Sequence, residues 1–557
     1  MSNDVPGAGF VCLTEPVGNM TDMNVHPTSI YSGVTPAMRV NQMKTTSHTL
    51  ATYVFILCLA SNTLASDCPV ADAAKRADWE QLSSLIANNG DATASQTDGM
   101  TALHWAAWHD NAEAAALLCQ HGADVNTANK YGVTPLSIAC ANGDAAIITQ
   151  LVDAGADVNL AQPGGETGLM TAARTGRLEA VNVLVDHKAD VNVKERNGQT
   201  AIMWAAAEGH ADVVEALIKA GAEFQTPLKS GFNPLFFAVR EGRQSVVDVL
   251  LTAGADVNAV MTPETKGPRV PRQGTSPLIL AVENGHFELA AHLLTCGADA
   301  NDQRSGFTAL HVLSWVRKPN LGDDIDGDPP PIGSGTMTSL QLVRELVKHG
   351  ADVNTRLKEG RAGRGRLNQK EATPFLLAAD TADVPYMKLL LELGADPTLT
   401  NADDCPPLLA ATGIGTIAPG EEAGTEDEAI AAVELLLNLG ADINAVDDNG
   451  ETAMHGAAYK SLPKMVRFLA DRGANISRWN TKNKYKWTPL LIAEGFRPGN
   501  FKPSAETIQA LHEVMLKSGV QPPSATDPRP PRDNDQYAPP KRPAAPKNPA
   551  APEPKKP

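Results

Sequence analysis

The chain has 557 residues, of which 43% are hydrophobic, and its formal net charge is -17. A chain this acidic is poorly suited to nucleic acid or an anionic membrane as its main partner, because both are negatively charged themselves. The hydrophobic content would serve several globular domains, so length alone does not decide the architecture.

Residues 43–66 have the layout of a secretory signal. They begin with Met43-Lys44, continue with an apolar run over residues 50–60 and end in small residues suited to cleavage. The apolar run is too short to span a bilayer comfortably. We therefore expect cleavage after Ala65 or Ser66 and an exported protein, periplasmic or extracellular, with no membrane span in the mature chain. An uncleaved anchor and a chance match are the alternatives.

A signal at this place makes residues 1–42 hard to explain, because secretory signals rarely carry so long a leader. We expect translation to start at Met43 or Met38, so that residues 1–42 are either not translated or disordered. Residues 67–97 follow the signal and show a two-helix pattern without a preceding hairpin. This pattern predicts an N-terminal capping helix pair, which a stack of repeats needs at its end.

From Asp98 to residue 520 the chain repeats itself with a period of about 33 residues. Segments that start at Asp98, Tyr131, Gly164, Asn197 and Ser230 align without a gap, and each opens on a Gly-x-Thr or Gly-x-Asn turn. Glycine permits a positive φ in the turn, and the following Thr or Asn can cap a helix. A short helix with an alanine pair and a longer helix with paired apolar residues then follow. The longer helices end at glycine.

This pattern resembles the ankyrin-repeat family over roughly three quarters of the chain. The resemblance implies an all-α solenoid of stacked helix-turn-helix units joined by β-hairpin-like finger loops. Later units start near Gln273, Ser305, Lys370, Asp403, Asn449 and Tyr485, which makes about eleven repeats behind the cap.

Shared columns of the repeats suggest structural roles for some conspicuous residues. His104, His311 and His455 stand just before the alanine pair, where the histidine of an ankyrin repeat hydrogen-bonds between neighbouring turns. Trp105 and Trp204 share a column that we interpret as core.

Five insertions interrupt the period. Those near 260–272 and 355–370 lengthen hairpins, whereas those near 318–337, 413–425 and 495–503 lie between the two helices of a repeat, which we place on the opposite edge of the stack. Insertions in repeat proteins tend to lie on the binding face, but loop growth is also tolerated at little cost.

Two of these insertions carry charges that could bind ions. Arg361, Arg364 and Arg366 form a flexible basic loop, which could bind an anion or fold back on the acidic body. Residues 322–328 offer oxygen ligands for Ca²⁺, but the glycine and the closing glutamate of a calcium loop are missing, which favours a solvated acidic loop.

The inward column of the first helices and the hairpin tips line the groove of an ankyrin stack. Aromatic residues and arginine often anchor protein interfaces, although scattered surface aromatics are also normal. We therefore predict a partner-binding groove, and its candidate residues are Met100, Trp108, Tyr131, Arg174, Phe232, Arg240, Trp315 and Tyr459.

No motif for a metal, a nucleophile or a phosphate stands in the chain, so we predict neither a catalytic site nor a cofactor. The scattered cysteines do not form a disulfide framework. Cys140 falls in the alanine column and is expected to be an inert core residue. Cys405 falls in a hairpin and is expected to be exposed.

Residues 521–557 are rich in Pro, Ala and Lys and predict a disordered spacer. The leading interpretation is a monomeric, non-enzymatic scaffold or regulator that binds a protein partner outside the cytoplasm. One alternative is a structural protein tethered to the cell envelope by its basic tail, and another is a cytosolic scaffold.

Overall fold

The computed structural model describes residues 68–529, apart from 266, 268–269, 322–329, 364, 498–501 and 525–526. The proposed leader, the signal, most of the tail, Arg364 and the candidate calcium loop lie outside the described residues. The described part is all-helical and contains no named strand, and one isolated bridge joins Ser95 to Thr101. The predicted fold is therefore confirmed.

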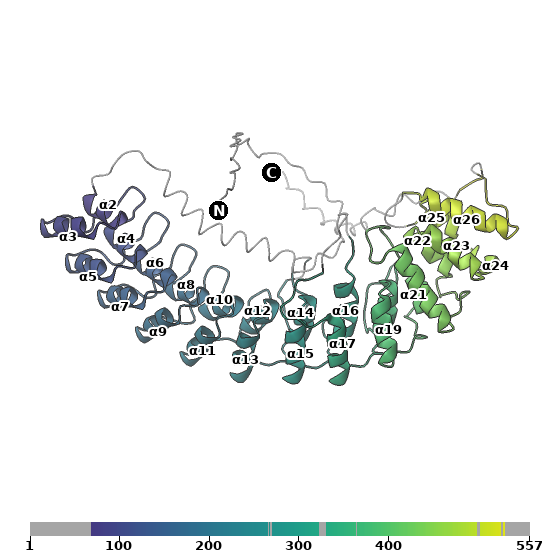
Figure 1. Cartoon of the computed structure of the whole chain (residues 1–557), viewed down its shortest axis with the longest axis horizontal. Coiled ribbons are helices and arrows are strands. Elements are labelled where there is room, and N and C mark those ends of the chain that lie inside the picture. The colour runs from purple at the N-terminus through teal and green to yellow at the C-terminus, as the bar shows by residue number, and fades with distance from the viewer. Residues whose placement is uncertain are drawn as a thin grey trace, which may run out of the picture. The chain divides into compact units, whose positions relative to one another are not determined.

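Consecutive helices pair and stack along the chain (Figure 1). The first helices of the pairs are α2 (Pro69–Lys75), α4 (Ala102–Trp108), α6 (Pro135–Asn142), α8 (Gly168–Arg174), α10 (Ala201–Glu208), α12 (Pro234–Arg240), α14 (Pro277–Glu283), α16 (Ala309–Arg317), α18 (Pro374–Asp380), α20 (Pro407–Ala411), α22 (Ala453–Lys460) and α25 (Pro489–Ala493). The second helices are α3 (Trp79–Ala87), α5 (Ala112–Gln120), α7 (Ala145–Asp153), α9 (Leu178–Asp186), α11 (Ala211–Lys219), α13 (Gln244–Thr252), α15 (Phe287–Thr295), α17 (Ser339–Lys348), α19 (Val384–Glu392), α21 (Glu426–Asn438), α23 (Pro463–Asp471) and α26 (Ala505–Lys517). A single turn, α24 (Ile476–Trp479), precedes the last pair.

Small residues explain why the first helices stack so closely. Ala106 and Ala107 are fully buried, and so are their counterparts Ala172 and Ala173 two repeats later. With only a methyl group at these positions, each first helix packs directly against the first helix of the next pair. The second helices form the other layer and bury one apolar stripe each, as Val213, Val214 and Leu217 do in α11.

The ends of the helices follow the capping residues in the sequence. Thr101 caps α4 by accepting a hydrogen bond from the backbone N–H of His104. In return, Nδ1 of the His104 ring accepts a hydrogen bond from the backbone N–H of Thr101. Gly122 follows α5 with φ at 84°, a conformation that glycine adopts without strain. The hairpins are linked to one another, because the backbone N–H of Lys130 donates to the carbonyl of Asp98, 3.0 Å away.

The repeated histidine connects neighbouring repeats as predicted at His104 and His311. Nε2 of His104 lies 3.0 Å from the carbonyl oxygen of Val133, and Nε2 of His311 lies 3.1 Å from that of Ala372. Both carbonyls belong to the hairpin of the next repeat. Burial lowers the pKa of His311 to about 4, so this ring stays neutral and keeps its hydrogen bonds at neutral pH.

The two cysteine expectations have different outcomes. Cys140 is fully buried, as predicted, and burial raises the pKa of its thiol to about 12. The expected exposure of Cys405 is wrong, because only 1% of this residue is exposed. Its backbone N–H donates to the side chain of Asn401, which turns the thiol of this tight hairpin into the core.

The last described residues do not form the free spacer that the composition predicts. Arg529 forms two hydrogen bonds with Glu494, at 2.6 and 2.7 Å, and so ties the chain to the last repeat. Residues 530–557 lie outside the described part. None of the helices in the described part is long and apolar enough to cross a membrane.

Candidate protein-binding face

The first helices present two columns of side chains toward the hairpins, and we call this surface the inner face. The columns are the fourth and seventh residues of each first helix, for example Trp105 and Trp108 in α4. Contacts with hairpin residues define the orientation. The indole N–H of Trp105 donates to Gln96 in the preceding hairpin, and the ring of Phe237 lies 5.1 Å from that of Phe232 in its hairpin.

Cationic side chains lie over the aromatic rings of the inner face. The Lys75 ammonium is 5.4 Å from the centre of the Trp105 ring, and the Arg174 guanidinium is 5.5 Å from that of Trp204. Arg240 lies 5.0 and 5.1 Å from the rings of Phe232 and Phe237. Such contacts fix the long cationic side chains against the surface while their charged ends stay available to solvent or a partner.

Two large aromatic residues of the predicted groove are exposed in the first repeats. Trp108 is 43% exposed and Tyr131 is 56% exposed. Trp105 and Trp204, which we interpreted as core residues, are only partly buried and pack against the edge of the core. The interpretation as fully buried core residues is therefore wrong, because each of the two residues keeps part of its surface accessible on the inner face.

Three other residues of the predicted groove are buried, so their expected exposure is wrong. Met100 is 7% exposed and Phe232 is 8% exposed, because both fold back from their hairpins onto the first helices. Tyr459 is 0% exposed, and its hydroxyl donates to the carboxylate of Glu451 in the hairpin of its own repeat. At Tyr459, hairpin residues therefore cover the helix column that lines the groove in the first repeats.

Trp315 is partly buried because the long hairpin of residues 355–370 packs over it. Leu357 from this hairpin is fully buried in a small apolar cluster, against which Trp315 and Leu367 pack. The Trp315 ring also meets Phe307 edge-on, with ring centres 4.9 Å apart. Residues of the chain itself therefore occupy the inner face at this repeat.

A second insertion, residues 413–425, continues this cover. A Cβ atom on Gly415 would lie 1.9 Å from the backbone nitrogen of Leu367, so the two insertions touch. Our expectation that they lie on opposite edges is wrong, because 413–425 crosses the ends of the first helices. The buried Lys460 ammonium donates to the carbonyl of Ala423 at 2.5 Å and holds the insertion in place.

Buried polar residues support the covered part of the inner face. Glu451 is 2% exposed and accepts hydrogen bonds from the hydroxyl of Tyr459 and the side-chain amide of Asn483, both at 2.8 Å. Burial raises the pKa of Glu451 to about 7, and the nearby charge of Asp447 adds to the effect, while the two hydrogen bonds and Lys484 oppose it.

This raised pKa predicts a pH dependence of stability. The native state holds the Glu451 proton more tightly than the unfolded chain, so its ionisation destabilises the fold as pH rises from about 4.5 to 7. Glu451→Gln keeps an acceptor and removes the charge. We expect the variant to gain up to about 3 kcal/mol over the parent protein at pH 8 and less than about 1 kcal/mol at pH 5. Urea titrations at both pH values measure this difference, and an equal difference at both would contradict it.

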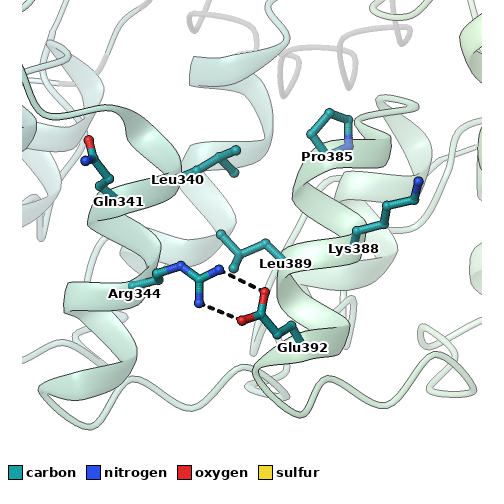
Figure 2. Close-up of a pocket in the computed structure, with 7 residues that line it drawn as sticks. All are labelled: Leu340, Gln341, Arg344, Pro385, Lys388, Leu389 and Glu392. Carbon is teal, nitrogen blue, oxygen red and sulfur yellow. Dashed lines mark hydrogen bonds and ion pairs between the residues drawn. The ribbon is translucent and has the colours of Figure 1, made fainter.

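The second-helix layer has a shallow hollow between α17 and α19. Figure 2 shows Leu340 and Leu389 at its floor, with Arg344 from α17 and Glu392 from α19 closing one end. The two terminal nitrogens of the Arg344 guanidinium each lie 2.8 Å from one carboxylate oxygen of Glu392. The hollow has no buried polar group aimed into it, so its chemistry does not favour a small-molecule site.

No metal site is evident in the part of the chain that the structure describes, where no three His, Cys, Asp or Glu side chains are arranged to hold an ion. In the basic loop, Arg361 is exposed and Arg366 is partly buried. Their neighbour Arg356 is engaged, because it donates to the carbonyl of Thr400 at 2.8 Å. Anion binding by this loop stays a prediction.

Sequence reasoning did not identify Lys75, Trp105 and Trp204 as members of the inner face. Their signal was present, since an aromatic residue in the fourth column of a first helix accompanies a basic residue one repeat earlier. The alanine pair next to the indoles pointed instead to the core. A tryptophan is too large to be buried fully beside two such closely packed helices.

Comparisons with known proteins agree with this architecture. A family profile described as "Ankyrin repeats (3 copies)" matches residues 70–162, 142–227, 169–261 and 423–502, and one described as "Ankyrin repeat" matches residues 273–304. Together these matches cover more than half of the chain. Arrays of this kind are typically not catalytic.

Three curated relatives are similar over about a third of the chain. The E3 ubiquitin-protein ligase KEG of Arabidopsis thaliana is 27% identical over 198 residues, 34% of this chain and 12% of the relative. The human SH3 and multiple ankyrin repeat domains protein 2 is 26% identical over 200 residues, 32% of this chain and 10% of the relative. The mouse B-cell lymphoma 3 protein homolog is 31% identical over 196 residues, 35% of this chain and 34% of the relative.

The alignments span a small part of each of these relatives, so the ligase activity in the first name belongs to the whole relative and does not transfer with the repeats. What the relatives share with this chain is the stacked repeat. With the helix pairs, the linked hairpins and the profile matches in agreement, the chain belongs to the ankyrin-repeat family.

Proposed function

We propose that the chain is a non-enzymatic scaffold or regulator that binds a protein partner on the inner face of its N-terminal repeats, within residues 68–262. The observation that carries the proposal is the contrast along the inner face. Trp108 and Tyr131 are exposed in the first repeats, whereas an insertion of the chain covers Trp315 and hairpin residues enclose Tyr459. Exposed aromatic residues next to arginine are the usual anchors of protein interfaces.

Photo-crosslinking tests where the partner binds. A photoreactive phenylalanine analogue at position 131 or 108 of the full chain should crosslink to a partner in an extract of the source cells. The same analogue at position 439 serves as the control, because Leu439 is 46% exposed at the end of the second helix α21. Crosslinks of equal yield from all three positions, or from 439 alone, would contradict an inner-face site.

We also propose export, on the signal-like layout of residues 43–66, which lie outside the described residues. Intact-mass measurement of the native protein tests this, and retention of residues 50–60 would exclude cleavage. Tethering to the envelope by the basic tail is the second candidate. It would weaken steeply with ionic strength and disappear on deletion of residues 530–557, whereas inner-face binding would survive the deletion.

A further inference from the structure

The hairpin tips of the open repeats carry basic residues at equivalent places. Lys130, Arg196 and Lys229 each stand two residues before the glycine of their turn, and all three are exposed. Backbone hydrogen bonds to neighbouring hairpins fix these tips. The N–H of Arg196 donates to the carbonyl of Gly164 at 2.9 Å, and the carbonyl of Lys229 accepts from the N–H of Glu264 at 2.9 Å. None of the three side chains forms an ion pair with a described residue.

Two further cations of the inner face are also without a carboxylate partner among the described residues. They are Lys75 and Arg174, which lie over the rings of Trp105 and Trp204. Arg240, by contrast, is already compensated, because Glu241 lies 3.1 Å from its guanidinium. The open inner face therefore presents five cationic side chains without an ion pair among the described residues, in the same repeats that expose Trp108 and Tyr131.

Two carboxylates of these hairpins are engaged within their own turns, whereas Glu166 is partly exposed and Glu264 is exposed. Glu195 is 7% exposed and accepts the backbone N–H groups of Asn197 and Gln199. Asp98 accepts the N–H of Met100 inside its own hairpin. The repeated exposed aspartates follow the second helices rather than the hairpin tips, and they are Asp124, Asp157, Asp190 and Asp256. A chain of net charge -17 thus exposes three cationic side chains without an ion pair on the hairpins of its N-terminal repeats.

We infer that the partner on this face is an acidic polypeptide segment in an extended conformation, with apolar side chains between its carboxylates. This inference rests on the proposed function and narrows it to one class of partner. The carboxylates would pair with Lys130, Arg196 and Lys229 along the tips, and the apolar side chains would pack on Trp108 and Tyr131. Arg174 and Lys75, which lie against the indoles on the first helices, would pair with further carboxylates of the segment.

Fluorescence anisotropy with defined 20-residue peptides tests the inference on the full chain. The acidic probe repeats Glu-Leu-Glu-Trp, the basic probe repeats Lys-Leu-Lys-Trp, and a 20-nucleotide oligothymidine tests the competing class of aromatic-and-basic ligand. We expect the acidic peptide alone to bind, and its affinity to fall at least tenfold between 50 and 300 mM salt because the contacts are largely ionic.

The decisive variant reverses the three tip charges, as Lys130→Glu, Arg196→Glu and Lys229→Glu together. We expect at least a tenfold loss of affinity for the acidic peptide. The matched control is the same number of reversals on exposed second-helix lysines: Lys219→Glu, Lys348→Glu and Lys388→Glu. It should leave the affinity within about twofold, and circular dichroism confirms that both variants fold.

The inference is overturned if the basic peptide or the oligothymidine binds as tightly as the acidic peptide, or if the control reversals weaken binding as much as the tip reversals. If position 131 crosslinks to a partner but the chain shows no preference for the acidic peptide over the other two probes, this inference is overturned and the proposed function stands. Absence of both crosslinking and peptide binding would overturn both.

Discussion

Asp383→Ala is expected to destabilise the C-terminal repeats by about 3–5 kcal/mol, because it leaves a buried arginine without its counter-ion. Asp383 is 1% exposed and Arg317 is 14% exposed at the side chain, and their closest atoms are 2.7 Å apart. The pair joins α16 to the start of α19 in the next repeat. Asp383 also accepts the backbone N–H of Tyr386, so the alanine removes a helix cap as well.

The exposed pair Arg344–Glu392 provides the comparison for this prediction. It has ideal geometry, but its side chains are 52% and 60% exposed, so Glu392→Ala should cost less than about 1 kcal/mol. Asp383→Asn, which keeps an oxygen for the cap, separates the lost charge from the lost cap. Urea unfolding followed by circular dichroism measures all three variants, and equal costs for Asp383→Ala and Glu392→Ala would show that burial does not govern these ion pairs.

Tyr459→Ala is expected to cost about 3–5 kcal/mol, because it removes one of the largest fully buried side chains and leaves a cavity. It also removes the hydroxyl that donates to Glu451. Trp108→Ala, at an exposed site of the same helix column, should cost within about 1 kcal/mol. For peptide affinity the order should be the opposite: Trp108→Ala should weaken binding more than Tyr459→Ala, since it removes contact surface from the open inner face.

Melting curves and anisotropy with the acidic peptide measure both quantities for these two variants. Tyr459→Phe serves as the control, because it keeps the ring and removes only the hydroxyl, at a cost of about 1–2 kcal/mol for the lost buried hydrogen bond. The burial of Tyr459 would have to be reconsidered if its alanine variant melted like the parent protein. The binding role of Trp108 would have to be abandoned if its alanine variant bound the peptide unchanged.

Local chemistry made most of the fold predictable. The Gly-x-Thr turns, the alanine pairs and the glycines after the second helices each satisfy a backbone or packing requirement within one repeat, so their recurrence predicts the stack. The bond from His104 to the next hairpin could also be anticipated, because the partner carbonyl recurs with the repeat.

The candidate site was less predictable because it depends on segments that break the period. Nothing near Tyr459 in the sequence announces that Glu451 and Asn483 enclose it, or that Lys460 holds down an insertion at Ala423. Leu357 and Leu367 are ordinary loop leucines in the sequence, and only their packing against Trp315 shows that they close the inner face. The period shows how long each insertion is, but it does not show which face of the stack the insertion covers.

Among the bonds of the covered region, two skip a repeat. Lys318, after α16, forms an ion pair with Glu428 in α21, and Asn320 accepts the backbone N–H of Ala423. In a stack held only by contacts between neighbours, a pulling force detaches one unit at a time from the end. We therefore expect the N-terminal repeats to unfold one at a time, and the repeats from α16 to α21, which these two bonds connect, to unfold together. The repeats that we propose bind a partner would then be the more easily deformed end of the stack. The repeats covered by the chain's own insertions would be the more rigid end.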